Sequence, residues 1–236
     1  MCYVIITCRS LGWTLLSIAV TLMIVASVVS PYWLVRTPDP SVSVQVTLLN
    51  NSAKTSEPVG EFKPTIGIFN RCQKYNHLYS ISDRETCANF VTDFMGENDD
   101  FPHAWKAAVI FFALAGLLLT LAMIMSVMSL FVRSMCGKSI FTLAGLVQSI
   151  GGLLCVIGLV IYPAGWGTTR VKRNCGEYAD PYIIDRCSLG WSFYMCIIGT
   201  VLTFVCSVLS IQAEHSTSSR KVEEEVMEGK NLICVL

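Results

Sequence analysis

The residues best suited to chemistry in this chain are its cysteines, of which there are eleven among 236 residues. Two pairs lie between the long apolar segments, Cys72 with Cys87 and Cys175 with Cys187. No pair has the Cys-x-x-Cys spacing of a metal site, so disulfide bonds are favoured. Four cysteines allow three connectivities, and pairing within each loop is favoured because each closed ring is short.

Enzyme chemistry is not indicated by any motif. The chain has no Gly-x-Ser-x-Gly, no His-Glu-x-x-His, no phosphate-binding P-loop and no histidine beside a nucleophile. We therefore predict a protein without catalytic residues, metal or cofactor. Its formal net charge is zero and it has no basic run, so nucleic acid is not an expected partner.

Apolar stretches long enough to cross a membrane set the architecture. Only 14% of the residues are charged, whereas soluble domains have about a quarter. A spanning helix needs about 20 apolar residues, and in lipid such a stretch must be helical to satisfy its backbone. Four segments without Asp, Glu, Lys or Arg meet this length: Leu11–Leu34, Ala107–Val132, Ile140–Trp166 and Leu189–Ala213. The first is too long for a cleaved signal peptide and predicts a retained anchor.

Orientation depends on the loops. Lys and Arg are more numerous in the two loops that hold the paired cysteines, which mildly opposes placing those loops outside. Disulfide chemistry and the glycosylation sequon at Asn50 favour that placement nevertheless. We predict a four-helix membrane bundle with a small extracellular antiparallel β-sheet and cytoplasmic termini. Its expected parts are 1–10 N-terminus, 11–34 first span, 35–103 extracellular loop, 104–132 second span, 133–139 cytoplasmic loop, 140–166 third span, 167–188 extracellular loop, 189–213 fourth span and 214–236 tail.

The first loop is too long to be a simple connector. Ser41–Leu49 alternates apolar and polar residues, which predicts a strand that ends at the sequon. A second extended run, Pro64–Phe69, leads into Cys72 and predicts a hairpin or small sheet. From Ser82 the apolar period becomes helical, so we expect a short amphipathic helix that carries Cys87.

Polar residues inside the spans are few. The absence of ionisable residues makes a pump or proton-coupled carrier improbable. Gln148 predicts an interhelical hydrogen bond, and the small residues Gly145, Ser149 and Gly152 share one helix face that favours close packing within the bundle or with a partner. Six aromatic residues at the outer span ends predict an interface belt: Tyr32, Trp33, Trp105, Tyr162, Trp166 and Trp191.

The final residues are apolar for an exposed end. Cys234 and Leu236 have the spacing of a carboxy-terminal ligand that adds a strand to a PDZ domain; a trafficking signal or a lipid-leaning end is an equal alternative. Cys2, Cys8, Cys136 and Cys234 are candidates for palmitoylation.

Several landmarks resemble known families. Trp33, Gly67-Ile68-Phe69, Cys72 and Cys87 resemble the claudin first-loop signature, with Phe69 in place of its second tryptophan. A closer resemblance is to the LHFPL (lipoma HMGIC fusion partner-like) tetraspan family, through Tyr162-Pro163-Ala-Gly165-Trp166, Cys175-Gly176 and Cys187-Ser-Leu-Gly190-Trp191. Both chain ends resemble one subfamily within it.

This resemblance implies a claudin-like, left-handed four-helix bundle topped by a small sheet. It also implies an accessory or scaffolding subunit that binds, traffics or modulates another integral membrane protein, such as a channel or receptor. The alternative is a claudin-like adhesion or barrier protein. Either function places the chain in the plasma membrane or a secretory-pathway membrane, in contact with the lipid bilayer.

Overall fold

The computed structural model describes residues 4–37, 64–74, 85–89, 103–131, 134–135, 138–218 and 232–235. The chain divides into two compact units. The helical unit comprises Met1–Val28, Ala107–Ile161 and Met195–Leu236, and the sheet unit comprises Val29–Lys106 and Tyr162–Tyr194. The predicted strand Ser41–Leu49 and the sequon at Asn50 lie outside the described residues.

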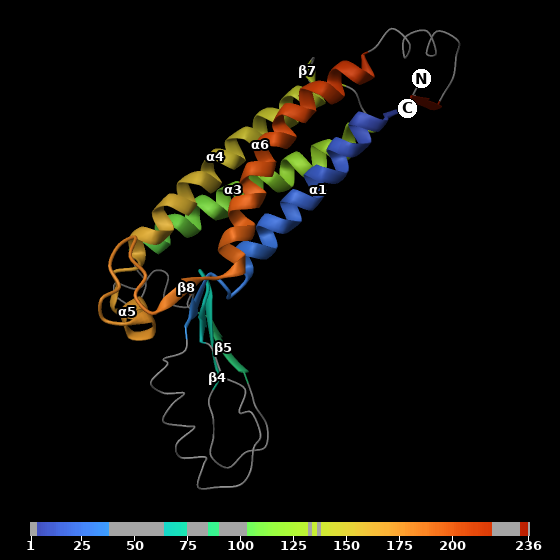
Figure 1. Ribbon diagram of the computed structural model, residues 1–236. Coiled ribbons are helices and arrows are strands. Elements are labelled where there is room, and N and C mark those ends of the chain that lie inside the picture. Colours follow the sequence, from blue (N-terminus) through green and yellow to red (C-terminus); the bar gives the residue numbers. More distant parts are fainter. Residues whose placement is uncertain are drawn as a thin grey trace, which may run out of the picture. The chain divides into compact units, whose positions relative to one another are not determined.

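Four long helices dominate the described part of the chain (Figure 1). They are α1 (Cys8–Val29), α3 (His103–Met128), α4 (Ile140–Ile161), which a 3₁₀ turn at Tyr162–Gly165 extends, and α6 (Trp191–Thr217). Each is long and apolar enough to cross a membrane. This chain is therefore a multi-pass membrane protein with four spans.

The ends of α1 differ from the predicted first span. Thr7 and Ser10 exchange hydrogen bonds, Ser10 N to Thr7 Oγ1 at 3.1 Å and Thr7 N to Ser10 Oγ at 3.0 Å, so the helix begins earlier, at Cys8. It ends at Val29 because the residue before Pro31 is disfavoured in a helix. Leu34, predicted inside the span, instead begins a strand.

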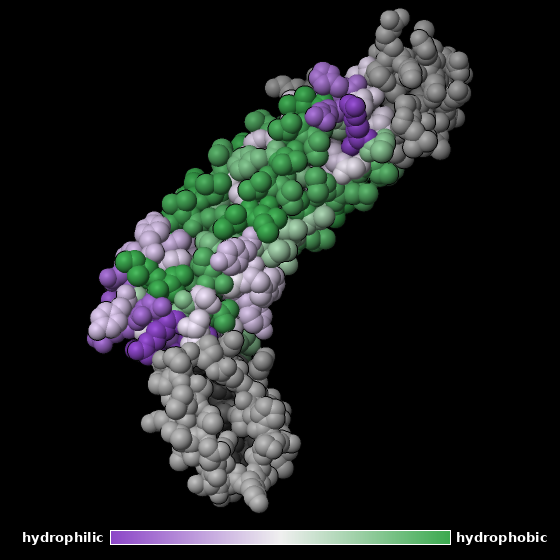
Figure 2. Space-filling model, in the orientation of Figure 1, coloured by the Kyte–Doolittle hydropathy of each residue, from purple (hydrophilic) through white to green (hydrophobic). Residues whose placement is uncertain are grey.

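The helical unit buries many small and polar residues beside its large core side chains, and it exposes many large apolar residues. Its core contains Trp13, Ile24, Leu119 and Phe141. Its outer surface is apolar as well, as the hydrophobic surface over the helices in Figure 2 shows. Leu117, for example, is 69% exposed. A soluble bundle would place charged residues there, so lipid is the solvent that this surface fits.

Among the described residues, the sheet unit contains five short antiparallel strands. They are β2 (Leu34–Arg36), β3 (Thr65–Ile66), β4 (Asn70–Lys74), β5 (Glu85–Asn89) and β8 (Cys187–Leu189), in the order β5-β4-β3-β2-β8. A seven-residue helix, α5 (Thr169–Cys175), precedes β8. The small antiparallel sheet predicted from the sequence is confirmed. The predicted extended run Pro64–Phe69 is interrupted by a turn, so that β3 pairs with β4 in a hairpin.

The short helix predicted around Cys87 is wrong over Glu85–Asn89. These residues form β5, which pairs with the whole of β4 and sets Cys87 directly opposite Cys72. Pairing with β4 supplies backbone hydrogen-bond partners along β5, and the disulfide holds Cys87 opposite Cys72. Together these interactions override the helical period, because a short, isolated helix is marginally stable. The strand that holds Cys72 also continues past it, to Lys74.

Two further strand pairs lie in the helical unit. β1 (Val4–Thr7) pairs in parallel with β9 (Leu232–Val235), so both ends of the chain meet. β6 (Ser134–Met135) and β7 (Lys138–Ser139) form a short hairpin between α3 and α4.

Candidate functional site

Both expected disulfide bonds are present, and each fastens a different part of the sheet unit. Cys72–Cys87 joins directly opposite residues of β4 and β5 across a 15-residue separation. Cys175–Cys187 joins the end of α5 to the start of β8. Covalent closure adds stability to a sheet whose strands are this short.

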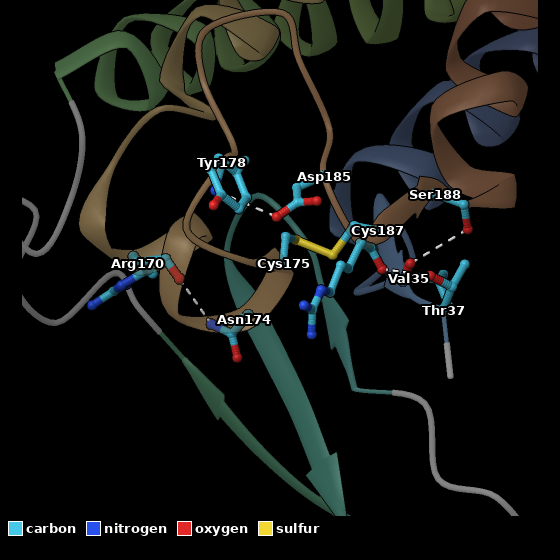
Figure 3. The surroundings of a disulfide bond; sticks show 10 residues. Val35, Thr37, Arg170, Asn174, Cys175, Tyr178, Asp185, Cys187 and Ser188 are labelled. Carbon is cyan, nitrogen blue, oxygen red and sulfur yellow. Dashed lines mark hydrogen bonds between the residues drawn. A yellow bond between two sulfur atoms is a disulfide. The ribbon is translucent and has the colours of Figure 1, made fainter. Parts of the chain in front are cut away.

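The surroundings of the second disulfide fix the edge of the sheet (Figure 3). Arg186 N donates to the Cys175 carbonyl at 2.7 Å, and Thr37 Oγ1 donates to the Arg186 carbonyl at 2.6 Å. Ser188 Oγ reaches the Val35 carbonyl at 3.3 Å. The loop before α6 is therefore bonded to the strand that follows α1, although the two are about 150 positions apart.

An aromatic cluster forms the core of the sheet unit. Tyr162 lies at its centre, with ring-centroid distances of 4.8 Å to Trp33, 5.4 Å to Trp105 and 6.2 Å to Trp166. Trp105 Nε1 also donates to the Tyr162 carbonyl at 3.1 Å. Phe193, from the first turn of α6, packs on Trp33 at 5.6 Å.

This cluster corrects the predicted interface belt. Trp33, Trp105 and Tyr162 are fully buried and Trp166 is 5% exposed, so these four rings cannot meet lipid headgroups. Their flat faces fill the unit because aromatic pairs stack and bury large areas. Tyr32 and Trp191 are exposed, and their ring centroids are 5.9 Å apart.

Two glycines of the family motif allow close approach. A Cβ on Gly165 would lie 2.5 Å from the Trp105 ring, and a Cβ on Gly190 would collide with the Tyr32 carbonyl. Gly190 N donates to the Trp33 carbonyl at 2.8 Å. Glycine is needed at both positions because any side chain would push apart the segments that carry the cluster.

Of the claudin-like residues, Gly67-Ile68-Phe69 and Cys72 lie in the β3–β4 hairpin, whereas Trp33 precedes β2 and Cys87 lies in β5. Gly67 N donates to the Asn70 carbonyl at 2.8 Å and closes the turn, and a Cβ there would be 2.7 Å from Pro31 Cα. Ile68 is fully buried, whereas Phe69 is only half-buried. The sequence analysis emphasised Phe69 and not Ile68, because nothing in this apolar run shows which of the two side chains is buried.

Polar residues of the helical unit hold the helices together. Gln148 Nε2 donates to Ser17 Oγ at 2.8 Å, which confirms the expected interhelical bond between α4 and α1. Thr14 Oγ1 on α1 donates to the Ser126 carbonyl on α3 at 3.1 Å. Such bonds add about 0.6 kcal/mol on average in membranes, so they serve packing.

The small-residue face of α4 packs against α6 within the bundle. Ser149 Oγ and Ser207 Oγ are 2.6 Å apart, and a Cβ on Gly145 would collide with Ser210. A Cβ on Gly152 would be 3.0 Å from Phe204. Of the two alternatives for this face, the bundle itself uses it.

The apolar tail is a strand of the described structure. Cys234 lies opposite Ile6 in the β1–β9 pair, whereas Leu236 lies outside the described residues. The cap of α1 is bonded nearby, since Thr7 Oγ1 is 2.9 Å from Ser216 Oγ near the end of α6. Both ends of the chain therefore belong to one local assembly.

Three free thiols lie inside the helical unit, where Cys155 and Cys196 both interact with Thr200. Cys155, Cys196 and Cys206 are buried among the helices, and no three His, Cys, Asp or Glu residues of the described ranges come close enough to hold a metal ion. The interactions described above stabilise the structure: they are two disulfides, an aromatic core and hydrogen bonds between helices.

Comparison with known proteins agrees with this arrangement. The family model for lipoma HMGIC fusion partner-like protein matches residues 9–212. The chain belongs to the LHFPL family. It is 42% identical over 236 residues to human LHFPL tetraspan subfamily member 2 protein and 41% identical over 239 residues to zebrafish member 2a protein, with all of each chain covered. Human member 3 protein is 26% identical, over 95% of this chain and 84% of its own length.

These similarities confirm the resemblance inferred from Tyr162–Trp166 and Cys187–Trp191. In this LHFPL protein, Tyr162 of the first motif lies at the centre of the aromatic cluster, and Cys187 of the second forms the disulfide with Cys175. The family signature therefore contributes to the core and the covalent closure of the sheet unit. The sequence alone did not reveal Phe193, because one phenylalanine in an apolar span carries no distinguishing spacing.

Proposed function

We propose that this LHFPL protein is a non-catalytic accessory subunit that binds, traffics or modulates another integral membrane protein, such as a channel or receptor. The observation that supports it best is the sheet unit, which two disulfides close and aromatic rings fill, in a chain that also has four membrane spans. A rigid, preorganised surface of this kind suits recognition because little ordering entropy is lost on binding.

The helical unit supports the same proposal. The ionisable residues of its long helices lie near their ends, at positions such as Arg9 and Glu214, and the buried polar side chains bond one helix to another. Proton relays and ion paths need ionisable groups within the membrane. A current carried by a partner, rather than by this chain, is the activity that such a protein would influence.

In this proposal the sheet unit is extracellular, Asn50 carries a glycan, and both termini are cytoplasmic, in the plasma membrane or a secretory-pathway membrane. An epitope tag placed after Leu236 should be reached by antibody only after permeabilisation. Labelling of that tag on intact cells would overturn the topology.

Purified protein in liposomes tests the accessory role directly. We expect no selective ion current from the LHFPL chain alone, and a change in current or surface density when a candidate channel or receptor is co-expressed. A selective current from the chain alone would contradict the proposal.

Helix faces provide a matched pair of variants for partner binding. Gly12 on α1 is exposed and a Cβ there would meet no atom within 4 Å, so Gly12→Leu should preserve the fold while blocking close approach of a partner helix. Gly116 on α3 is equally open, and Gly116→Leu is the matched control on another helix. If only one variant fails to co-purify with the partner, the partner binds at that helix face. If both variants still co-purify with it, the binding surface lies in the sheet unit.

The tail adds a second proposed contact. Cys234 and Leu236 fit a PDZ ligand that binds by strand addition. Because β9 already pairs with β1, a PDZ domain would have to take over or extend that pairing. A tail peptide that binds no PDZ domain, while full-length protein behaves as before when Leu236 is removed, would exclude this contact.

Adhesion is the second candidate, favoured by the claudin-like residues Trp33, Gly67, Cys72 and Cys87, which lie together in the sheet unit. Freeze-fracture of expressing cells separates the two functions. Intramembrane strands at cell contacts would support adhesion, and their absence would leave the accessory role.

A further inference from the structure

The loop between α5 and β8 contains a turn with a strained backbone. Asp180 N donates to the Ile183 carbonyl at 3.2 Å and Ile183 N to the Asp180 carbonyl at 2.8 Å, so Pro181 and Tyr182 form a two-residue reversal. Tyr182 has a φ of 65°. A bulky residue is disfavoured there, and glycine is the usual occupant of such a turn position.

The surrounding structure holds Tyr182 in this conformation. Its backbone N–H donates to the Pro163 carbonyl at 3.1 Å. A Cβ on Gly167 would be 2.6 Å from Pro181 Cδ, so the turn lies directly against the chain that leaves the third span. Lys172 Nζ is 3.5 Å from Asp180 Oδ1. Backbone strain that the structure maintains at a surface position points to a use for the side chain displayed.

The displayed side chains are apolar or amphipathic. Tyr182 is 58% exposed and Ile183 is 57% exposed, and Tyr178 shortly before them is 83% exposed. These exposed fractions are high for large side chains, since the loop also has charged residues that could face water instead. Water is therefore an unfavourable neighbour for this turn.

The length of the third span places the turn at the membrane boundary. α4 has 22 residues, Ile140–Ile161, which gives about 33 Å of helix against about 30 Å of hydrocarbon. Pro163 lies two residues beyond Ile161, in the 3₁₀ turn that ends the candidate span Ile140–Gly165, so its carbonyl, which binds Tyr182 N, lies near the end of the span. Tyrosine is enriched at that depth because its ring is apolar and its hydroxyl is polar.

We propose that the Asp180–Ile183 turn is a lipid-interface anchor, which seats Tyr182 and Ile183 in the phospholipid headgroup layer next to the end of the third span. The turn then has the interfacial role that the sequence analysis assigned to aromatic residues whose rings are in fact buried. The exposed pair Tyr32 and Trp191, at the ends of two other spans, has the same chemistry.

The charges of the loop favour neutral headgroups. Within 167–188 there are four basic residues and three acidic ones: Arg170, Lys172, Arg173, Arg186, Glu177, Asp180 and Asp185. Recognition of anionic lipid requires an excess of basic charge, whereas three acidic residues nearly balance the four basic ones here and Lys172 pairs with Asp180. Zwitterionic phosphatidylcholine is therefore a sufficient ligand. This inference needs only the four membrane spans and does not depend on the accessory role.

Site-specific fluorescence tests the anchor. Tyr182→Cys is labelled with a thiol-reactive bimane in protein whose Cys2, Cys8, Cys136 and Cys234 are serine, and is reconstituted in phosphatidylcholine vesicles. Cys155, Cys196 and Cys206 remain because they are buried. Glu177→Cys is the matched control, since its native charge and exposure require water.

We expect nitroxide on the lipid headgroup to quench the label at 182, and aqueous iodide to quench it several-fold less than the label at 177. Equal iodide quenching at both positions would overturn the proposal. Protection at 182 from both quenchers would also overturn it, because that result indicates contact with protein, including a second copy. Ile183→Cys repeats the measurement with the native tyrosine in place if Tyr182→Cys fails to fold.

Discussion

The two units of this LHFPL protein solve the same stability problem with different interactions. In the helical unit the outer surface is apolar, and close contact depends on small residues such as Gly145 and Gly152 and on hydrogen bonds such as Gln148–Ser17. In the sheet unit stability comes from a buried aromatic cluster and two disulfides. Where lipid is the solvent, burying apolar side chains between helices adds little to stability, so close packing and hydrogen bonds matter more. Where water is the solvent, apolar burial and covalent cross-links provide most of the stability.

The largest effect is expected from the centre of the aromatic cluster. Trp33 is fully buried against Tyr162 and Phe193, so Trp33→Ala should lower the free energy of unfolding by about 3–5 kcal/mol. Trp191→Ala is the control, because that ring is 52% exposed. Thermal unfolding in detergent measures both. Similar losses from the two variants would contradict the assignment of the cluster as the core.

The next effect tests the covalent closure. Replacing Cys72 and Cys87 together by serine should cost about 3 kcal/mol, from the loop-closure entropy regained by the unfolded chain. Reductant should destabilise the wild-type protein and have less effect on this variant, which keeps only Cys175–Cys187. Cys206→Ala, in the helical unit, should keep the full response to reductant. A wild-type protein insensitive to reductant would show that neither disulfide stabilises the sheet unit.

Packing of the small-residue face gives a smaller effect. Gly152→Val adds atoms where Phe204 is already 3.0 Å from the Cβ position, so it should destabilise by about 1–3 kcal/mol. Gly12→Val on α1 adds the same atoms in open space and controls for helix propensity. Thermal unfolding of the two variants should differ in that direction. Equal stability would mean that α4 and α6 are not closely packed at Gly152.

Hydrogen bonds between the helices should contribute less to the free energy of unfolding than the packing at Gly152 does. A double-mutant cycle with Gln148→Leu and Ser17→Ala should give a coupling of about 0.6 kcal/mol between α4 and α1. Ser149→Ala with Ser207→Ala provides a second pair, between α4 and α6, for comparison. A coupling as large as the loss from Trp33→Ala would remove the distinction between the two units.

The sequence predicts the helical unit better than the sheet unit for a physical reason. A span is a local property, since about 20 apolar residues in lipid must form a helix whatever surrounds them. Gln148 could be assigned to an interhelical bond because a polar residue in a span has few other uses. The ends of α1 were misplaced because Thr7, Ser10 and Pro31 act through capping and backbone geometry, which composition does not reveal.

The sheet unit depends on contacts between distant positions. Cys87 was assigned to a helix because its neighbours have a helical period, and the partner strand β4 decided otherwise. Trp33, Trp105 and Tyr162 were assigned to the lipid interface because span ends usually place aromatics there. Their burial results from mutual packing among segments far apart in the sequence, which one chain read in order cannot supply.

The last prediction concerns the paired termini, where almost no change in stability is expected. A two-stranded ribbon is marginal in water, so the β1–β9 pair should open and close readily. Ile6→Cys places a thiol opposite Cys234, and mild oxidation should join them within one chain. Ile5→Cys is the control, because its partner in the register is Ile233 and not Cys234. Both variants carry Cys2→Ser and Cys8→Ser, and mass spectrometry of the disulfide-linked peptides measures the yield. Equal yields would contradict the register, whereas a yield at Ile6 that falls when a PDZ domain binds the tail would show that β1 and the domain compete for the same strand.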